Sequence, residues 1–208
     1  MALNIEQSLL VESGRNASAP FDIGACFNSA MAALKRDFLT IVLGYFVWMI
    51  AVTILAFSFV GLIIVPALAM GFFRFNLKAI RNQSPSISDL FDGFDLFGPA
   101  LAWALVQSIL IFVGYIFCLL PGIYLAVAWH FSGYLLADKK FGFWECMEVS
   151  RRIITAHWGW ALLLLIVGSI IAYAGLLACL IGILVTIPFY GLMFTASYAR
   201  AVDTPVNR

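Results

Sequence analysis

The stretch Leu96–Ala137, LFGPALAWALVQSILIFVGYIFCLLPGIYLAVAWHFSGYLLA, runs for 42 residues without an Asp, Glu, Lys or Arg. One crossing of a hydrocarbon core about 30 Å thick needs about 20 helical residues. The stretch is therefore long enough to cross a membrane twice. Pro121-Gly122 stands near its middle and indicates a turn, because proline disrupts a helix interior but fits a first helical turn.

Two similar uncharged tracts lie on either side of it, Phe38–Phe73 with 36 residues and Ile153–Ala199 with 47. Each has breakers near or beyond its middle, Gly61 and Pro66 in the first and Gly182 and Pro188 in the third. We place each proline in or near the first turn or two of a returning helix. The three tracts predict an all-α integral membrane protein with six transmembrane helices arranged as three hairpins. The predicted spans are residues 38–58, 62–80, 98–118, 121–138, 157–179 and 183–201. Four long helices, or re-entrant loops, are the alternatives.

The composition supports a membrane location. Hydrophobic residues make up 63% of the chain and charged residues 11%, whereas soluble domains carry about 25% charged residues. A soluble protein could not cover its surface with so few charges. The net charge of +1 provides no basic field, so we expect no nucleic-acid partner.

The distribution of charge predicts the orientation. The Lys and Arg residues between Lys35 and Arg200 all lie away from the predicted outer turns. The positive-inside rule then places these ends, and both termini, in the cytoplasm. The first residues include Glu6, Glu12 and Arg15 and do not resemble a signal peptide. We therefore expect a polar segment at 1–20, one membrane domain at 21–202 and a tail at 203–208.

The membrane domain is predicted to contain a threefold internal repeat, with units at about 21–82, 83–139 and 140–202. Each unit would consist of a short amphipathic helix and a hairpin. At an offset of 120 residues, Phe21 matches Phe141 and Cys26 matches Cys146. Both cysteines would face the cytoplasm as free thiols.

The three amphipathic segments are expected to lie at the cytoplasmic membrane interface. In the second, Ile87, Leu90, Phe91 and Phe94 are spaced as on one helix face, and Ser86 marks a plausible helix start. These helices either cap the bundle or bind lipid or a protein partner. The polar residues of this candidate cytoplasmic surface are Asp89, Asp92, Glu145, Glu148, Arg151 and Arg152.

A second candidate site lies at membrane depth. Arg74 and His130 are two ionisable residues predicted to lie at membrane depth, and Asn76 is two residues from Arg74 in the sequence. Ionisable groups within a membrane are functional candidates. Alternatively, Arg74 extends its charge to the interface, and a neutral His130 donates one hydrogen bond to a neighbouring helix.

Several motifs resemble a known group of proteins. They are Leu90-Phe-Asp-Gly-Phe94, Leu120-Pro-Gly-Ile-Tyr-Leu-Ala-Val-Ala-Trp129, Ala137-Asp-Lys-Lys and Phe143-Trp-Glu-Cys-Met-Glu-Val-Ser-Arg151. The chain from about residue 20 to 202 resembles bacterial integral membrane proteins of unknown activity. These are similar in pattern to the membrane domain fused to some glycerophosphoryl diester phosphodiesterases. The resemblance implies a bacterial inner-membrane protein and transfers no catalytic residue.

The sequence contains no HExxH, G-x-S-x-G or Walker A motif, and we expect no metal or cofactor. The first functional hypothesis is therefore a non-enzymatic scaffold or accessory protein that presents its cytoplasmic helices to membrane lipids or to a protein partner. The alternative is a transporter, channel or lipid-handling protein, because internal repeats with breakers at matching positions are typical of transporter folds. An intramembrane enzyme is the third possibility.

Overall fold

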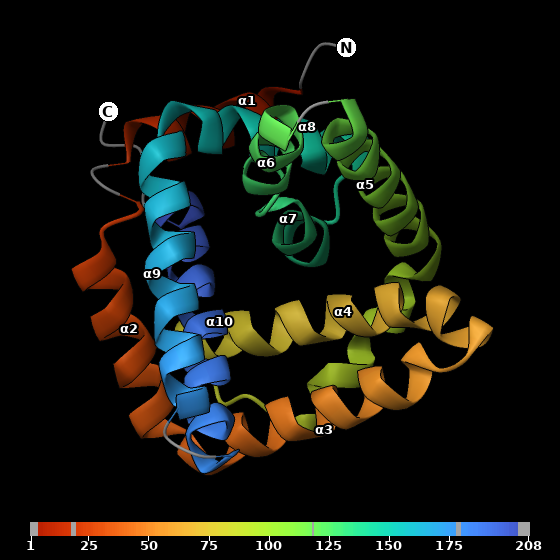
Figure 1. Ribbon diagram of the computed structural model, residues 1–208. Coiled ribbons are helices and arrows are strands. Elements are labelled where there is room, and N and C mark those ends of the chain that lie inside the picture. The colour runs from red at the N-terminus through yellow and green to blue at the C-terminus, as the bar shows by residue number, and fades with distance from the viewer. Residues whose placement is uncertain (1–3, 18–19, 118, 178–179, 204–208) are drawn as a thin grey trace.

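The computed structural model describes residues 4–17, 20–117, 119–177 and 180–203, and the regular structure in these ranges is entirely helical (Figure 1). Its elements, in chain order, are α1 (Ile5–Asn16), α2 (Ile23–Arg36), α3 (Phe38–Ala56), α4 (Phe59–Ile80), the 3₁₀ helix η1 (Ile87–Leu96), α5 (Phe97–Phe117), α6 (Leu119–Ala128), α7 (Ser132–Lys139), α8 (Phe143–Ala156), α9 (Trp158–Leu177) and α10 (Leu180–Val202).

Several of these helices have the length and composition of membrane spans. Four segments of the described chain are long and apolar enough to cross a bilayer: Phe38–Ala56, Val60–Ile80, Ile87–Phe117 and Leu119–Lys139. Helices α8 and α9 form a fifth candidate if they are taken together, although they are bent by 94° at His157. The fold is thus all-helical and compatible with a multi-pass membrane protein.

The span predicted at 121–138 is wrong as a single helix. Helix α6 ends at Ala128 and α7 begins at Ser132. Ser150 of α8 lies at this break, where its hydroxyl accepts a hydrogen bond from the Phe131 amide (3.2 Å) and donates one to the Ala128 carbonyl (2.8 Å). A buried break is tolerated because a side chain from another helix satisfies its backbone groups.

The prolines differ in their depth within the helices. Pro121 is the third residue of α6, as expected. Pro66 and Pro188 are the eighth and ninth residues of α4 and α10, so both lie deeper than a first turn. Part of the outer turn predicted near 177–182 lies outside the described residues.

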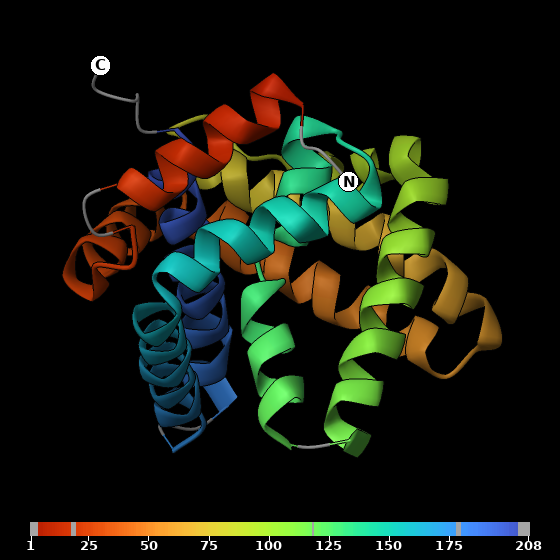
Figure 2. The same ribbon diagram turned by 90° about the horizontal axis from the view of Figure 1, so that it is seen from above.

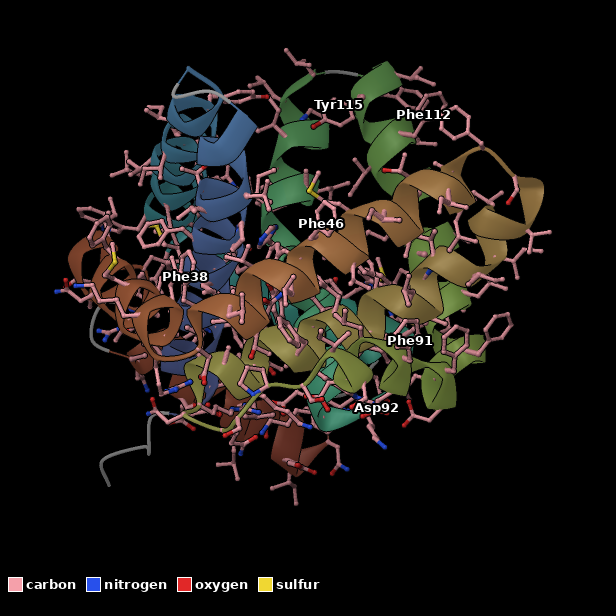
Figure 3. All side chains as sticks on the ribbon, turned by 90° about the horizontal axis from the view of Figure 1, so that it is seen from below. Phe38, Phe46, Phe91, Asp92, Phe112 and Tyr115 are labelled. Atoms are coloured by element: carbon pink, nitrogen blue, oxygen red, sulfur yellow. The ribbon has the colours of Figure 1, made fainter. Side chains whose placement is uncertain are left out.

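The paired helices α3–α4, α5–α6 and α9–α10 form three hairpins. In Figure 2 the α5–α6 and α9–α10 hairpins extend toward the same side, and α1 and α8 lie across their other end. The α3–α4 hairpin runs in a different direction, across the molecule in Figure 1. Exposed side chains such as Phe46 of α3 and Phe112 of α5 cover the outer surface (Figure 3).

The first and third amphipathic helices correspond closely in position. Helix α2 spans Ile23–Arg36 and α8 spans Phe143–Ala156, so both ends are offset by 120 residues. Each is followed by one residue of similar backbone conformation, Asp37 with φ −121° and ψ 39° and His157 with φ −130° and ψ 29°. The next helix, α3 or α9, then begins at once.

The second amphipathic segment differs, because η1 is a 3₁₀ helix with three residues per turn. Its buried apolar face is formed by Leu90, Gly93 and Leu96, which are three residues apart. Phe91 and Phe94, predicted to share a face with Leu90, are instead 52% and 44% exposed. The α-helical spacing that we assumed for this segment is therefore wrong.

Gly93 explains why η1 packs so closely on α4. A Cβ atom at Gly93 would overlap the carbonyl oxygen of Ala67 and the amide nitrogen of Gly71. A Cβ atom at Gly71 would in turn overlap the carbonyl of Leu90. The two backbones meet only because both positions lack a side chain. This contact fixes η1 against the first hairpin.

The polar segment predicted at 1–20 contains an ordered helix, α1. Its start has a capping box, in which the Gln7 side chain accepts a hydrogen bond from the Asn4 amide (2.9 Å). Gly14 of α1 packs against Ile153 of α8. The Asn-x-x-Gln spacing was present in the sequence and could have revealed this helix.

Arg81 joins the charged ends of all three hairpins. It follows α4 directly, and its guanidinium contacts Asp138 of α7 at 2.6 Å and Asp203, just after α10, at 2.8 Å. The Tyr198 hydroxyl also donates to Asp138 (3.0 Å). We call Arg81, Asp138 and Asp203 the clasp. The Arg81 guanidinium donates hydrogen bonds to Asp138 and to Asp203. These bonds, those to Asp138 above all, outweigh the effect of burial and raise the pKa of Arg81 above its ordinary value.

Candidate functional site

Helices from all three hairpins border one cavity of about 390 Å³. Helices α3 and α4 supply one wall, α5 and the α6–α7 segment a second, and α10 a third. The lining residues are Tyr45, Trp48, Met49, Phe72, Phe73, Trp103, Gln107, Ala126, His130, Tyr134, Ile187, Tyr190, Gly191 and Phe194. The cavity thus lies where the three hairpins converge.

The three residues of the predicted intramembrane cluster occupy different environments. His130 lies in the α6–α7 break and lines the cavity, with its ring centre 4.4 Å from that of Phe194. Asn76 is fully buried behind the wall, where its Oδ1 accepts a hydrogen bond from the Tyr45 hydroxyl (2.9 Å). Arg74 does not line the cavity, so the three side chains form no single cluster.

Arg74 belongs to the charged end of the molecule. Its guanidinium binds both carboxylate oxygens of Asp95 (2.8 and 3.0 Å) and donates to the carbonyl of Ala137 (3.1 Å). It also contacts the carbonyl of Asp92. Arg74 therefore joins α4, η1 and α7 beside the clasp. Lys140 adds a second cation to Asp95 at 3.0 Å.

Three polar side chains of the cavity wall, those of Trp103, Gln107 and Tyr134, are hydrogen-bonded to hydroxyl groups of neighbouring residues. The Trp103 indole donates to the Ser132 hydroxyl (2.8 Å), and the Ser132 oxygen lies within hydrogen-bond distance of both the Trp129 carbonyl (2.5 Å) and Oε1 of Gln107 (2.7 Å). On the opposite side, the Thr195 hydroxyl donates to the Tyr134 hydroxyl (3.1 Å). These bonds connect α5 to α7 and α7 to α10, and they hold aromatic side chains of the wall in place.

The other aromatic residues of the wall pack in pairs. Trp48 and Phe72 are stacked, with ring centres 4.5 Å apart and an interplanar angle of 17°. Phe194 packs edge-on against Tyr190, with centres 5.1 Å apart. Gly191 lies beside the Tyr45 hydroxyl, which a Cβ atom at position 191 would overlap. A glycine is therefore needed for this helix to approach Tyr45.

Sequence reasoning identified only His130 among the lining residues. The aromatic residues come from helices far apart in the chain, and their spacing along each helix is that of ordinary packing residues. Gly133 and Gly191 are the local indication of close packing around the cavity. A Cβ atom would overlap the ring of Phe73 at position 133 and the Tyr45 hydroxyl at position 191. Even so, a glycine indicates a close approach and does not reveal its partner.

The candidate cytoplasmic surface divides into two parts. On η1, Asp89 is only 4% exposed, since its carboxylate binds Lys78 (2.7 Å) and the Ser86 amide (2.9 Å). Asp92 is exposed at the edge of the molecule (Figure 3). Of the two η1 carboxylates in this surface, that of Asp89 is therefore bound by groups of this chain, and that of Asp92 is exposed.

On α8, the Glu145 carboxylate accepts a hydrogen bond from the Gln7 side chain of α1 (2.7 Å). Glu148 binds Arg151 at 2.8 Å and Arg152 at 2.6 Å. Helix α1 thus covers part of α8, and the remaining charges of this helix largely neutralise one another. The surface contains few charges that are not already paired within the chain.

A larger hollow of about 510 Å³ lies beside the α1–α2 connection and is lined in part by Phe21, Asp22, His157 and Trp160. Its lining includes Pro20, and the two preceding residues lie outside the described part, so the inter-hairpin cavity is the better-defined site. Within the described residues, no group of three or more His, Cys, Asp or Glu side chains could hold a metal ion.

No protein-family model, curated protein sequence or solved structure matches this chain. The functional assignment therefore rests on the chain's own sequence and structure.

Proposed function

We propose that this chain is a protein of the bacterial cytoplasmic membrane that crosses the bilayer six times, with both termini in the cytoplasm. The clasp and the Arg74–Asp95 pair gather charge from all three hairpins at one end of the molecule. The outer turns, in contrast, expose apolar residues such as Phe57 and Leu120. Positive-inside orientation places the charged end in the cytoplasm. The resemblance to bacterial integral membrane proteins supports the same location.

We also propose that the membrane domain arose as a repeated unit of one interfacial helix and one hairpin. The offset of 120 residues between α2 and α8, and the matching bends after them, support equivalence of the first and third units. The second unit has diverged, since its short helix is 3₁₀ and its returning span is broken. The short helices would lie at the membrane interface.

The function that the geometry supports best is binding of a small, lipid-soluble molecule between the hairpins. The observation that carries this proposal is the cavity itself, which all three hairpins border and which is lined mainly by aromatic side chains. Binding sites are typically apolar concavities with a few polar groups. Among the earlier hypotheses, this favours a lipid-handling or transport role, with membrane lipids as the immediate partners.

The scaffold hypothesis receives less support. A docking surface for a charged partner needs accessible unpaired charges, yet Asp89, Glu145 and Glu148 are engaged by side chains of this chain. The proposed role requires no catalysis. Binding and release of a lipid-soluble molecule need only a cavity and hairpins that separate, so we propose a non-enzymatic protein.

Photolabelling tests the proposed site. A neutral, apolar diazirine probe, activated in membranes that contain the protein, should label cavity residues such as Trp48 and Tyr190 in addition to lipid-facing ones. Ala126→Phe would fill the cavity and should suppress cavity labelling at least several-fold. Ala56→Phe adds the same ring at an exposed position of α3 and should leave the labelling unchanged. Labelling confined to lipid-facing residues would refute the proposal.

A further inference from the structure

The lining of the inter-hairpin cavity has an unusual composition. Eight of its fourteen residues are Phe, Tyr or Trp, against 15% in the whole chain. It contains no Asp, Glu, Lys or Arg. The enrichment exceeds what an apolar cavity requires, since aliphatic residues are plentiful in this chain. The wall therefore presents π-systems from α3, α4, α5, α7 and α10 to whatever occupies the space.

Aromatic rings attract cations. The ring quadrupole makes each face negative, and a cation held over such a face is stabilised, most strongly where water is excluded. The basic side chains nearest in sequence to the lining are held elsewhere, since Arg74 binds Asp95 and Lys78 binds Asp89. No fixed positive charge of the lining thus opposes a cationic ligand.

Two polar groups of the wall also favour a cation. The Tyr45 hydroxyl uses its proton to bind Asn76, so its oxygen remains an acceptor. Oε1 of Gln107 lies 2.7 Å from the Ser132 hydroxyl and is a second acceptor oxygen of the wall. An acceptor oxygen complements a positive charge or an N–H donor and repels an anion.

We propose that the molecule held between the hairpins is an organic cation, such as a quaternary ammonium group or a protonated amine on an apolar body. The inference rests on the proposed binding function and specifies its ligand class. The aromatic lining and the Tyr45 oxygen are independent contributions of the same sign. Choline is a suitable probe because 3,3-dimethylbutan-1-ol has the same shape without the charge.

The full-length protein would be reconstituted in phosphatidylglycerol nanodiscs, with empty discs as the blank. Trp48 and Trp103 line the cavity, so tryptophan fluorescence should change on binding. We expect a saturable response to choline and at least tenfold weaker binding of the neutral alcohol. Equal affinities for the two probes would overturn the assignment of a cation.

Charge substitutions at Gln107 provide the sharper test. Gln107→Glu places a negative charge in the wall and Gln107→Lys a positive one. With about 7 Å between the introduced charge and the choline nitrogen, and an effective dielectric constant near 20, each substitution should change the affinity for choline tenfold or more, in opposite directions. Binding of the neutral alcohol should change little. The same substitutions at Gln83, which is exposed in the α4–η1 connection, should have no effect and serve as matched controls.

The outcomes separate the two proposals. If Gln107→Glu and Gln107→Lys leave choline affinity the same, or if choline gives no response, the cation inference falls even where photolabelling succeeds. If photolabelling also fails, the binding function falls with it. Phosphatidylcholine discs distinguish the source of the cation. If the choline response is lost in phosphatidylcholine discs only, the lipid headgroup occupies the site and is the natural ligand. If the response is retained in both kinds of disc, the ligand is a free cation.

Discussion

Loss of the clasp should destabilise the whole membrane domain, because Arg81 joins segments from three hairpins. In Arg81→Ala, the Asp138 carboxylate would lose its main partner while its side chain stays only 13% exposed. Lys139, at 3.4 Å, and Tyr198 would remain. Hydrogen bonds to charged groups contribute about 1.5–3 kcal/mol each, and leaving a buried charge unpaired costs 3–5 kcal/mol.

Partial exposure reduces that range. The Asp203 side chain is 38% exposed, so its bond to Arg81 contributes at most about 1 kcal/mol. We expect Arg81→Ala to lower the free energy of unfolding by about 3 kcal/mol, most of it from Asp138. The control is Arg152→Ala, which removes an exposed pair within α8 and should cost less than about 0.5 kcal/mol.

Reversible unfolding in SDS, followed by tryptophan fluorescence, would measure both variants. A double-mutant cycle with Asp138→Asn should give a coupling free energy above about 1 kcal/mol, because the two side chains share a pair of hydrogen bonds. Additive effects of the two substitutions, or an Arg81→Ala variant as stable as Arg152→Ala, would refute the reasoning.

Three further predictions follow from other parts of the fold. Gly93→Ala forces a Cβ atom into the backbone of α4 and should lower the free energy of unfolding by about 1–3 kcal/mol. Gly98 has open space around it, so Gly98→Ala should leave the stability unchanged, and thermal melting would compare the two variants. Burial raises the pKa of Cys26 to about 11, so its alkylation at pH 8, followed by peptide mass spectrometry, should be about a hundredfold slower than after denaturation. In intact cells, an impermeant maleimide should label Phe57→Cys at the outer turn and not Ser84→Cys in the α4–η1 connection; the reverse pattern would contradict the proposed orientation.

Much of the helical organisation could be predicted locally. The uncharged tracts predicted α3, α4 and α5 to within three residues at each end, because helices end where charges and breakers begin. Helix α1 could also have been found from its Asn4–Gln7 capping pattern. The conformation of η1 could not, since Leu90, Phe91 and Phe94 fit an α-helical spacing equally well. Close packing of Gly93 on α4, which is a tertiary contact, accompanies the 3₁₀ form.

The sequence by itself determined that this chain is helical and apolar and that its charges gather at the ends of its hairpins, because these properties depend on composition and spacing along one segment. The tertiary structure decided where the fourth predicted span breaks, since Ser150 of another helix satisfies the backbone there. It also separated Arg74 from His130. The cavity exists only because aromatic side chains from helices far apart in the chain converge, and the spacing of residues along one helix does not predict which other helix it meets.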